Sequence, residues 1–191
     1  MKRRFLTLSS LLLLITAPLW AEAETYKLDP VHSSVHFRVS HNSVSTFQGG
    51  FNAVDGQIVF DEANPSNTSF EITVDANSVD TRNERRDGHV KSPDFLNAAQ
   101  FPNLTFKSQS VRKTGEDAYE VSGKITIRGV TKDITAVVRQ IGARDLGRGG
   151  FRRGFSTELK INRRDFNVSY GNPEGLGDEV TLIIDVEAVR Q

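Results

Sequence analysis

The sequence predicts an all-β fold: an antiparallel barrel of about eight strands with a short helical insert over one end. Most of the chain after residue 23 alternates apolar and polar side chains, and turn signals separate the alternating runs. One stretch near residues 81–99 carries helix-start signals instead. About eight half-buried strands favour a closed barrel, because an open sheet would leave two edges exposed.

The composition narrows the class of protein. The 191 residues hold 24 Lys and Arg, 24 Asp and Glu, and no cysteine. Disulfides, thiolate metal sites and cysteine nucleophiles are therefore excluded. The balanced charge gives no reason to expect a nucleic-acid partner. One domain of this length can bury a core or enclose a small cavity.

The first 23 residues predict export. A basic start at Lys2–Arg4 precedes an apolar run from Phe5 to Ile15, and Ala21–Ala23 offers the small residues of a signal-peptidase site. The alternative is a retained anchor, but the apolar stretch is shorter than the roughly 20 residues of a spanning helix. We expect residues 1–23 to be a cleaved secretory signal peptide and residues 24–191 to form one domain.

Strands are predicted wherever apolar residues recur at every second position. Each such run would turn one face to an apolar interior and the other to water. The apolar faces run from Val35 to Val39, Phe70 to Val74, Tyr119 to Ile127, Phe155 to Ile161 and Val180 to Ala188.

Turns and one change of apolar parity interrupt these runs. Turns are predicted at Asn64–Asn67, Lys113–Asp117 and Arg128–Thr131. The apolar parity shifts between Phe51 and Val54, which predicts a β-bulge near Asn52-Ala53.

The helical insert follows. Thr81–Glu84 fits a capping box, and Ser92-Pro93-Asp94 fits a second helix start. Two short helices are expected, over about Arg82–Val90 and Pro93–Ala99.

Phenylalanine is abundant, at 12 residues against three Tyr and one Trp. An eight-stranded barrel is just wide enough to be filled by side chains or to hold one small ligand, and both possibilities stay open. A hollow interior would bind a long apolar guest by burying its surface. The candidate lining residues are Val35, Phe37, Val39, His41, Phe47, Phe51, Phe70, Ile72, Val74, Phe95, Phe101, Phe106 and Phe155.

The remaining polar residues give little support to chemistry. His32 and His36 would lie roughly 13 Å apart along a strand, too far to share one metal ion, so no metal site is predicted. His41 shares the inward parity of Val35, so it could contact a ligand or be an ordinary rim histidine. No serine elbow or phosphate-binding loop occurs, and we assign no catalytic residue and no cofactor.

Arginines gather in two places and could form a solvated face or a mouth that receives an anionic head group or touches anionic lipid. The first group lies in the insert and the second around a glycine-rich turn: Arg82, Arg85 and Arg86, then Arg144, Arg148, Arg152 and Arg153.

Several segments, in order along the chain, resemble the YceI-like family. These segments are Tyr26–Pro30, His32–Phe37, Ser78–Thr81, Arg85–Asp87, His89, Ser92–Leu96, Phe101-Pro102, Thr105-Phe106, Gly123–Lys132 and Asn162–Phe166. Asn42-Ser43 departs from the family, where many members have a glycine-containing turn.

The resemblance implies an extended lipocalin-like barrel in the periplasm that binds polyisoprenoids such as prenyl quinones or isoprenyl diphosphates. It also implies stress-related roles and transfers no catalytic residues. We expect a carrier of isoprenoid lipid, a monomer or homodimer that touches the membrane surface transiently. The alternatives are a stress-response structural protein with a filled barrel, or an enzyme acting on a bound lipid with His41 as base.

Overall fold

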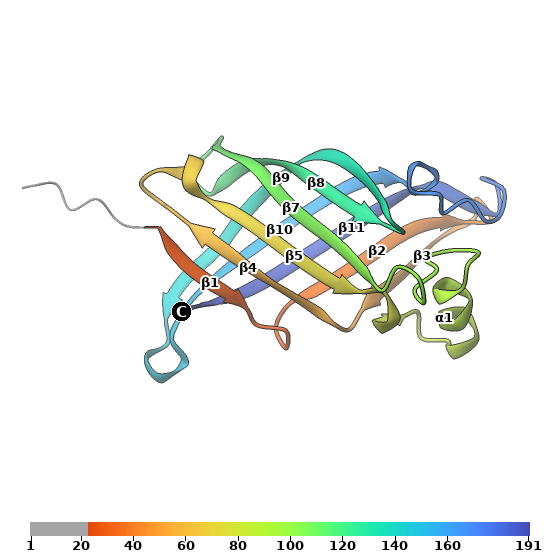
Figure 1. Ribbon diagram of the computed structural model, residues 1–191, viewed down its shortest axis with the longest axis horizontal. Coiled ribbons are helices and arrows are strands. Elements are labelled where there is room, and N and C mark those ends of the chain that lie inside the picture. The colour runs from red at the N-terminus through yellow and green to blue at the C-terminus, as the bar shows by residue number, and fades with distance from the viewer. Residues whose placement is uncertain (1–22) are drawn as a thin grey trace, which may run out of the picture.

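The described part of the chain, residues 23–191 of a computed structural model, forms an antiparallel sheet closed on itself (Figure 1). The predicted signal peptide lies outside the described residues, apart from Ala23. The elements are β1 (Glu24–Leu28), β2 (Ser34–His41), β3 (Ser45–Phe51), β4 (Val54–Phe60), η1 (Pro65–Asn67), β5 (Ser69–Asp75), η2 (Ala76–Ser78), β6 (Val79–Asp80), α1 (Glu84–Lys91), β7 (Asn103–Lys113), β8 (Ala118–Ile127), β9 (Val130–Asp145), η3 (Gly147–Gly149), β10 (Phe151–Asn162), η4 (Arg163–Phe166) and β11 (Leu176–Arg190).

Eight strands close the barrel. Their order is β1-β4-β5-β7-β8-β9-β10-β11, and β1 completes the ring because it pairs with both β4 and β11. All these pairings are antiparallel. The predicted closed antiparallel barrel is therefore confirmed.

Three further strands lengthen the barrel at one end. β1 and β2 use successive stretches of the same edge of β11: β1 pairs with residues 188–190, whereas β2 pairs with residues 176–185. β3 then pairs with β2, and the two-residue β6 pairs with β3. A break at Pro30 separates β1 from β2, since proline cannot donate to the ladder. The result is an elongated barrel that β2, β3 and β6 extend beyond β1 at the far end.

The predicted β-bulge near Asn52-Ala53 is wrong, because these two residues do not belong to a strand. The strand is interrupted there, and the residues form a corner between β3 and β4, which pair with different neighbours. The Asn52 amide donates to the Ser78 carbonyl and the Ala53 amide donates to Ser78 Oγ, each with a donor–acceptor distance of 3.0 Å. The parity shift arises because both Phe51 and Val54 point inward on either side of this corner.

Only one of the two expected helices forms. In α1 the N-cap is Asn83, whose side chain accepts from the Arg86 amide, so the capping box beginning at Thr81 is wrong. Arg82 has a φ of +62°, which is not helical. The second helix, over Pro93–Ala99, is also wrong: these residues make a series of turns that includes Asn97 at a φ of +48°. Within residues 23–191, no helix has the length and apolar character needed to span a bilayer.

Side chains fill the end of the barrel away from α1. The rings of Phe60 and Tyr119 meet edge to face with centroids 5.6 Å apart, and Phe155 packs against Phe60 at the same distance. The buried guanidinium of Arg153 stacks over Phe60 with its Cζ 4.4 Å from the ring centroid, and Arg153 Nε donates to Tyr26 Oη over 2.9 Å. This end of the barrel is therefore plugged by a cation among aromatic rings.

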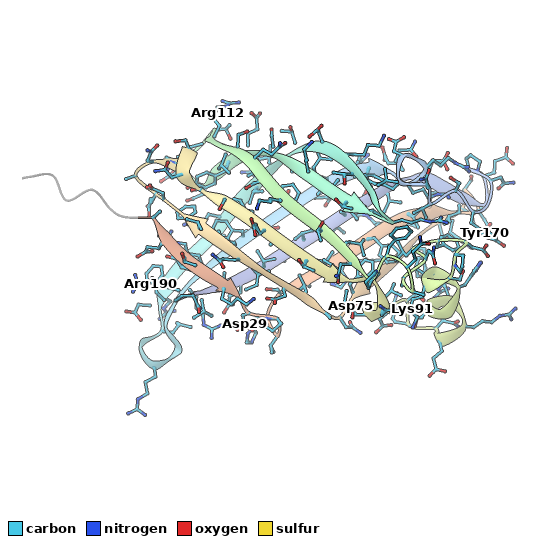
Figure 2. The ribbon with its side chains drawn as sticks, in the orientation of Figure 1. Asp29, Asp75, Lys91, Arg112, Tyr170 and Arg190 are labelled. Atoms are coloured by element: carbon cyan, nitrogen blue, oxygen red, sulfur yellow. The ribbon has the colours of Figure 1, made fainter. Side chains whose placement is uncertain are left out.

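Asp29, which lies just after β1 (Figure 2), holds the following loop in place. Its carboxylate accepts from His32 Nδ1 over 2.9 Å and from Arg152 Nη1 over 2.7 Å, and these bonds hold the pKa of Asp29 well below its usual range. A carboxyl group with a depressed pKa stabilises the fold above the unfolded-state pKa of about 3.9 and loses that contribution as the pH falls.

We therefore expect Asp29→Asn to lower the melting temperature at neutral pH, with the difference from the parent protein shrinking as the pH falls from about 4 toward 2. Thermal melts of both proteins across this range measure the effect. A difference that stays constant down to pH 2 would contradict the role given to the Asp29 charge.

Candidate ligand-binding cavity

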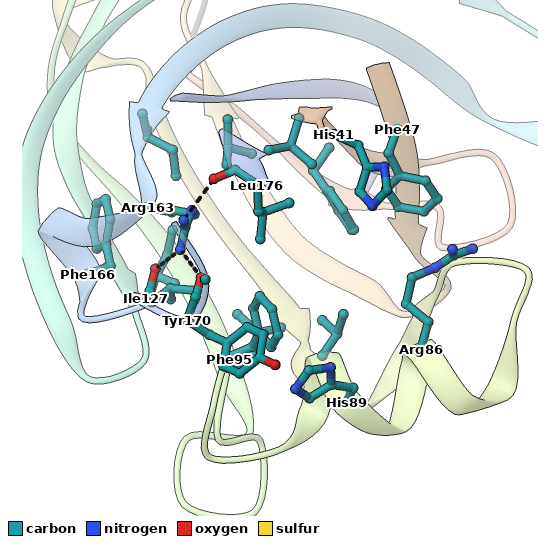
Figure 3. A pocket seen from close by; sticks show the side chains of 18 of the residues that line it. His41, Phe47, Arg86, His89, Phe95, Ile127, Arg163, Phe166, Tyr170 and Leu176 are labelled. Carbon is teal, nitrogen blue, oxygen red and sulfur yellow. Dashed lines mark hydrogen bonds between the residues drawn. The ribbon is translucent and has the colours of Figure 1, made fainter. Parts of the chain in front are cut away.

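A cavity of about 530 Å³ occupies the barrel end that carries α1 (Figure 3). Its walls come from β2, β3, α1, β7, β8, β10, η4, β11 and the turns that follow α1 and η4. Pockets of roughly 300–1,000 Å³ are typical of sites for small organic ligands. The filled-barrel alternative does not describe this end of the molecule.

The walls of the cavity are apolar. The ring of Phe37 lies over Gly49 of β3, where a Cβ atom would approach Phe37 Cζ to 2.5 Å, so glycine is required for this packing. Phe37 also meets the rings of Phe47 and Phe51, with centroids 6.4 and 5.9 Å away. The apolar lining residues are Phe37, Val39, Phe47, Phe51, Val90, Phe95, Leu96, Leu104, Ile127, Ile161, Phe166, Val168, Leu176, Val180 and Leu182.

The mouth is marked by the lining residues that are exposed to solvent. On one side these are His41, Ser45 and Thr46 at the β2–β3 hairpin, and on the other they are Tyr170–Asn172 in the loop between η4 and β11. Polar and amphipathic side chains thus gather at the opening, whereas hydrocarbon lines the interior.

Two residues of α1 border the mouth. His89 is packed between the rings of Phe95 and Tyr170, with centroids 4.9 and 4.7 Å away, and its Nε2 lies 2.9 Å from Asp94 Oδ2. Arg86 stacks over Phe47 at 4.3 Å and donates to Oγ1 and the carbonyl of the buried Thr81. The insert is therefore joined to the barrel by aromatic and hydrogen-bonded contacts on both sides of the opening.

Arg163 fixes the loop that forms the other half of the mouth. Its buried guanidinium donates to the carbonyls of Val168 (2.7 Å), Tyr170, Leu176 and Gly177 (2.9 Å each). Burial lowers the pKa of Arg163, and Asp178, 3.0 Å away, opposes that shift. Arg163 therefore shapes the rim through backbone contacts, and its donors are already engaged.

A second, smaller cavity of about 110 Å³ continues the first along the barrel. It shares Phe51, Leu104, Ile127 and Leu182 with the larger cavity, so the two lie end to end. Its remaining walls are also mainly apolar and include Phe70, Phe106 and Phe155. The apolar space is therefore longer than the main cavity alone.

The sequence matches the model of the YceI-like domain over residues 26–188. The chain belongs to the YceI-like family. It is 43% identical to Protein YceI of Salmonella newport and 42% identical to that of Salmonella arizonae, each over the full length of both chains.

Solved structures agree with this assignment. The YCEI protein of Campylobacter jejuni is 31% identical with a TM-score of 0.72, over 80% of this chain and 89% of that one. BcnA of Burkholderia cenocepacia is 26% identical with a TM-score of 0.78, over 85% and 99%. A polyisoprenoid binding domain from Saccharophagus degradans shares the fold at 18% identity and a TM-score of 0.68, over 87% and 98%.

The YceI-like barrel brings most of the predicted lining residues onto two adjacent cavities. Phe101 is the exception: it lines neither cavity and packs instead against Gly129 in the β8–β9 turn. The larger cavity takes Phe37, Val39, His41, Phe47, Phe51 and Phe95, and the smaller one takes Val35, Phe51, Phe70, Ile72, Val74, Phe106 and Phe155. Ligand contact by these residues stays a prediction.

The two arginine groups of this YceI-like chain do not form one mouth. Arg86 borders the larger cavity, but the glycine-rich turn lies at the opposite end of the barrel. There Arg153 is buried, and Arg152 Nη1 donates to Asp29 Oδ2 and to Glu187. Reading both groups as parts of a single head-group mouth is therefore wrong.

One cluster has the residue types of a metal site. Ligand atoms of Asp29, His32 and Glu187 lie within 4.8 Å of one another. The guanidinium of Arg152 already bridges the two carboxylates, so it offsets part of their charge without an ion. His36, which the sequence considered beside His32, faces Gly50 on β3 instead.

Sequence reasoning missed the lining residues contributed by η4, by the start of β11 and by the loop between them. Arg163, Tyr170 and Leu176 lie outside the clear alternating pattern. Because arginine is seldom buried, the sequence around Arg163 predicts an exposed segment, whereas Arg163 is buried. For Arg163, the only signal in the sequence was the resemblance of the segment Asn162–Phe166 to the family.

Proposed function

We propose that this protein is a periplasmic carrier of long-chain isoprenoid lipids, held in the larger cavity with part of the chain reaching the smaller one. The observation that carries the proposal is a 530 Å³ space whose interior walls are almost wholly hydrocarbon. In such a site, each Å² of apolar ligand surface that is buried stabilises the complex by about 25 cal/mol, and few polar groups are available to a ligand. A long, flexible hydrocarbon chain such as a polyisoprenoid fits this apolar lining.

The capacity of the cavity supports the same class of ligand. A cavity of roughly 150 Å³ accommodates benzene, so by that scale the larger cavity would hold on the order of 20 carbon atoms, or about four prenyl units. The structural relative from Saccharophagus degradans is described as a polyisoprenoid binding domain, which supports the isoprenoid assignment.

Location and mode of action complete the proposal. The signal-peptide pattern of residues 1–23 supports export to the periplasm. A binding role is favoured over catalysis because, in the part of the chain that the structure describes, no side chain hydrogen-bonds to the ring of His41. A general base normally has an orienting partner.

The direct test is extraction of the natural ligand. Protein purified gently from its own host should yield an isoprenoid in organic extracts analysed by mass spectrometry, at close to one molecule per chain. Delipidated protein incubated with the same host lipids should recover it. Extracts without any isoprenoid, together with no uptake by the delipidated protein, would overturn the proposal.

A further inference from the structure

The β9–β10 hairpin forms an exposed finger at the barrel end opposite the cavity (Figure 1). Beyond Arg139, which pairs with the first residue of β8, strand β9 keeps a ladder partner only on its β10 side. Residues 141–149 are all exposed to solvent. We define residues 139–150 as the finger.

Two large aliphatic side chains project from the finger. Ile141 is the extra residue where the register shifts between Gly154 and Phe155, so it lies in a β-bulge, and 70% of its surface is exposed. Leu146 occupies the tip and is 49% exposed. The bulge therefore turns the Ile141 side chain toward water, and together with Leu146 it gives the finger two exposed aliphatic side chains.

The finger also carries unbalanced positive charge. At its base, Arg152, Arg153 and Arg190 are paired with carboxylates. In contrast, Arg139, Arg144 and Arg148 form no ion pair with any residue between 23 and 191. The one acidic residue of the finger, Asp145, accepts from the Gly147 amide over 2.8 Å, and its charge helps to raise the pKa of Arg190.

We propose that the finger is a membrane-docking surface that binds a bilayer containing anionic lipid, with its arginines at the phosphate groups and Leu146 and Ile141 among the acyl chains. A bilayer with anionic lipid would bind both the arginines and the aliphatic side chains. Each arginine near an anionic surface adds about fivefold in affinity, and the aliphatic side chains leave water. A nucleic-acid backbone would reward only the cations. A protein partner would need roughly 800 Å² of each surface, which a narrow convex hairpin does not offer.

The first test uses vesicles of phosphatidylcholine with and without phosphatidylglycerol and the purified mature protein. We expect binding that requires phosphatidylglycerol and weakens with salt. Replacing Arg139, Arg144 and Arg148 together by Gln should reduce binding roughly a hundredfold. The matched control replaces Arg82, Arg85 and Lys91 by Gln, which removes the same charge at the cavity end and should change binding little. Equal losses in both triple variants, or none in the finger variant, would overturn the proposal.

The second test uses the absence of cysteine from the chain. An environment-sensitive dye on Leu146→Cys should brighten and shift to the blue when anionic vesicles are added. The same dye on Val44→Cys, which is 84% exposed beside the cavity mouth, should stay in water. The reverse pattern would overturn the proposal in favour of docking by the mouth, and a silent dye at both positions would overturn membrane docking itself. Neither test depends on isoprenoid binding, so failure here leaves the carrier proposal standing.

Discussion

Phe37→Asp is expected to lower the affinity for an isoprenoid such as geranylgeraniol at least a hundredfold. Phe37 contributes to the wall of the main cavity, where its ring meets those of Phe47 and Phe51. The substitution removes an apolar surface worth about 1.5–3 kcal/mol when buried. It also places a carboxylate against hydrocarbon, where an unpaired charge costs more than a neutral polar group. A titration with labelled geranylgeraniol measures the loss.

Two measurements separate this effect from unfolding. Phe37 is only half-buried, so the variant should keep its barrel, as circular dichroism would show. Phe37→Leu keeps an apolar side chain at the same position and should bind within about tenfold of the parent, since volume-conserving apolar changes are tolerated best. Unchanged affinity in a folded Phe37→Asp protein would assign this face to structure alone.

Arg163→Met is expected to cost about 3–5 kcal/mol of stability, the range found when one partner of a buried ionic network is removed. Four carbonyls lose their donor at once, and Met cannot replace any of these bonds. For a chain of this length the melting temperature should fall on the order of 10 °C. Ligand affinity should fall as well, because the same bonds hold the rim loop against β11.

Arg164→Met provides the matched control. Arg164 lies next in sequence and contacts Asp178 over 2.6 Å and the Gly171 carbonyl over 2.8 Å, but its side chain is 34% exposed. Water can replace its partners, so a much smaller change in melting temperature is expected. If the two substitutions destabilise the protein equally, burial of Arg163 is not what makes it important.

The alternating faces made much of the barrel predictable. Val35, Phe37 and Val39 share a side because a strand has a period of two, and the structure turns that side inward. The turn at Arg128-Gly129 could also be predicted from the sequence. Both residues have positive φ, +48° and +74°, as a two-residue hairpin turn requires.

The parts that sequence could not give depend on distant contacts. The segment 93–99 has a helix-start pattern, but the amides of Leu96 and Ala98 donate back to α1 carbonyls, such as that of Val90, and the segment remains a set of turns. Whether rings meet or leave a space is decided by strand spacing and by the loop that Arg163 fastens, so the cavity could not be derived from the Phe count. Likewise, nothing in the local sequence places Arg86 and Arg148 at opposite ends of the molecule.

The aromatic plug around Arg153 has a consequence for how a guest is taken in and given up. Because side chains close the barrel at that end, an isoprenoid carried as proposed would enter tail first beside α1 and leave by the same opening. The head group of that ligand would then stay at the opening, and the depth of the cavity would leave the excess length of a longer chain outside.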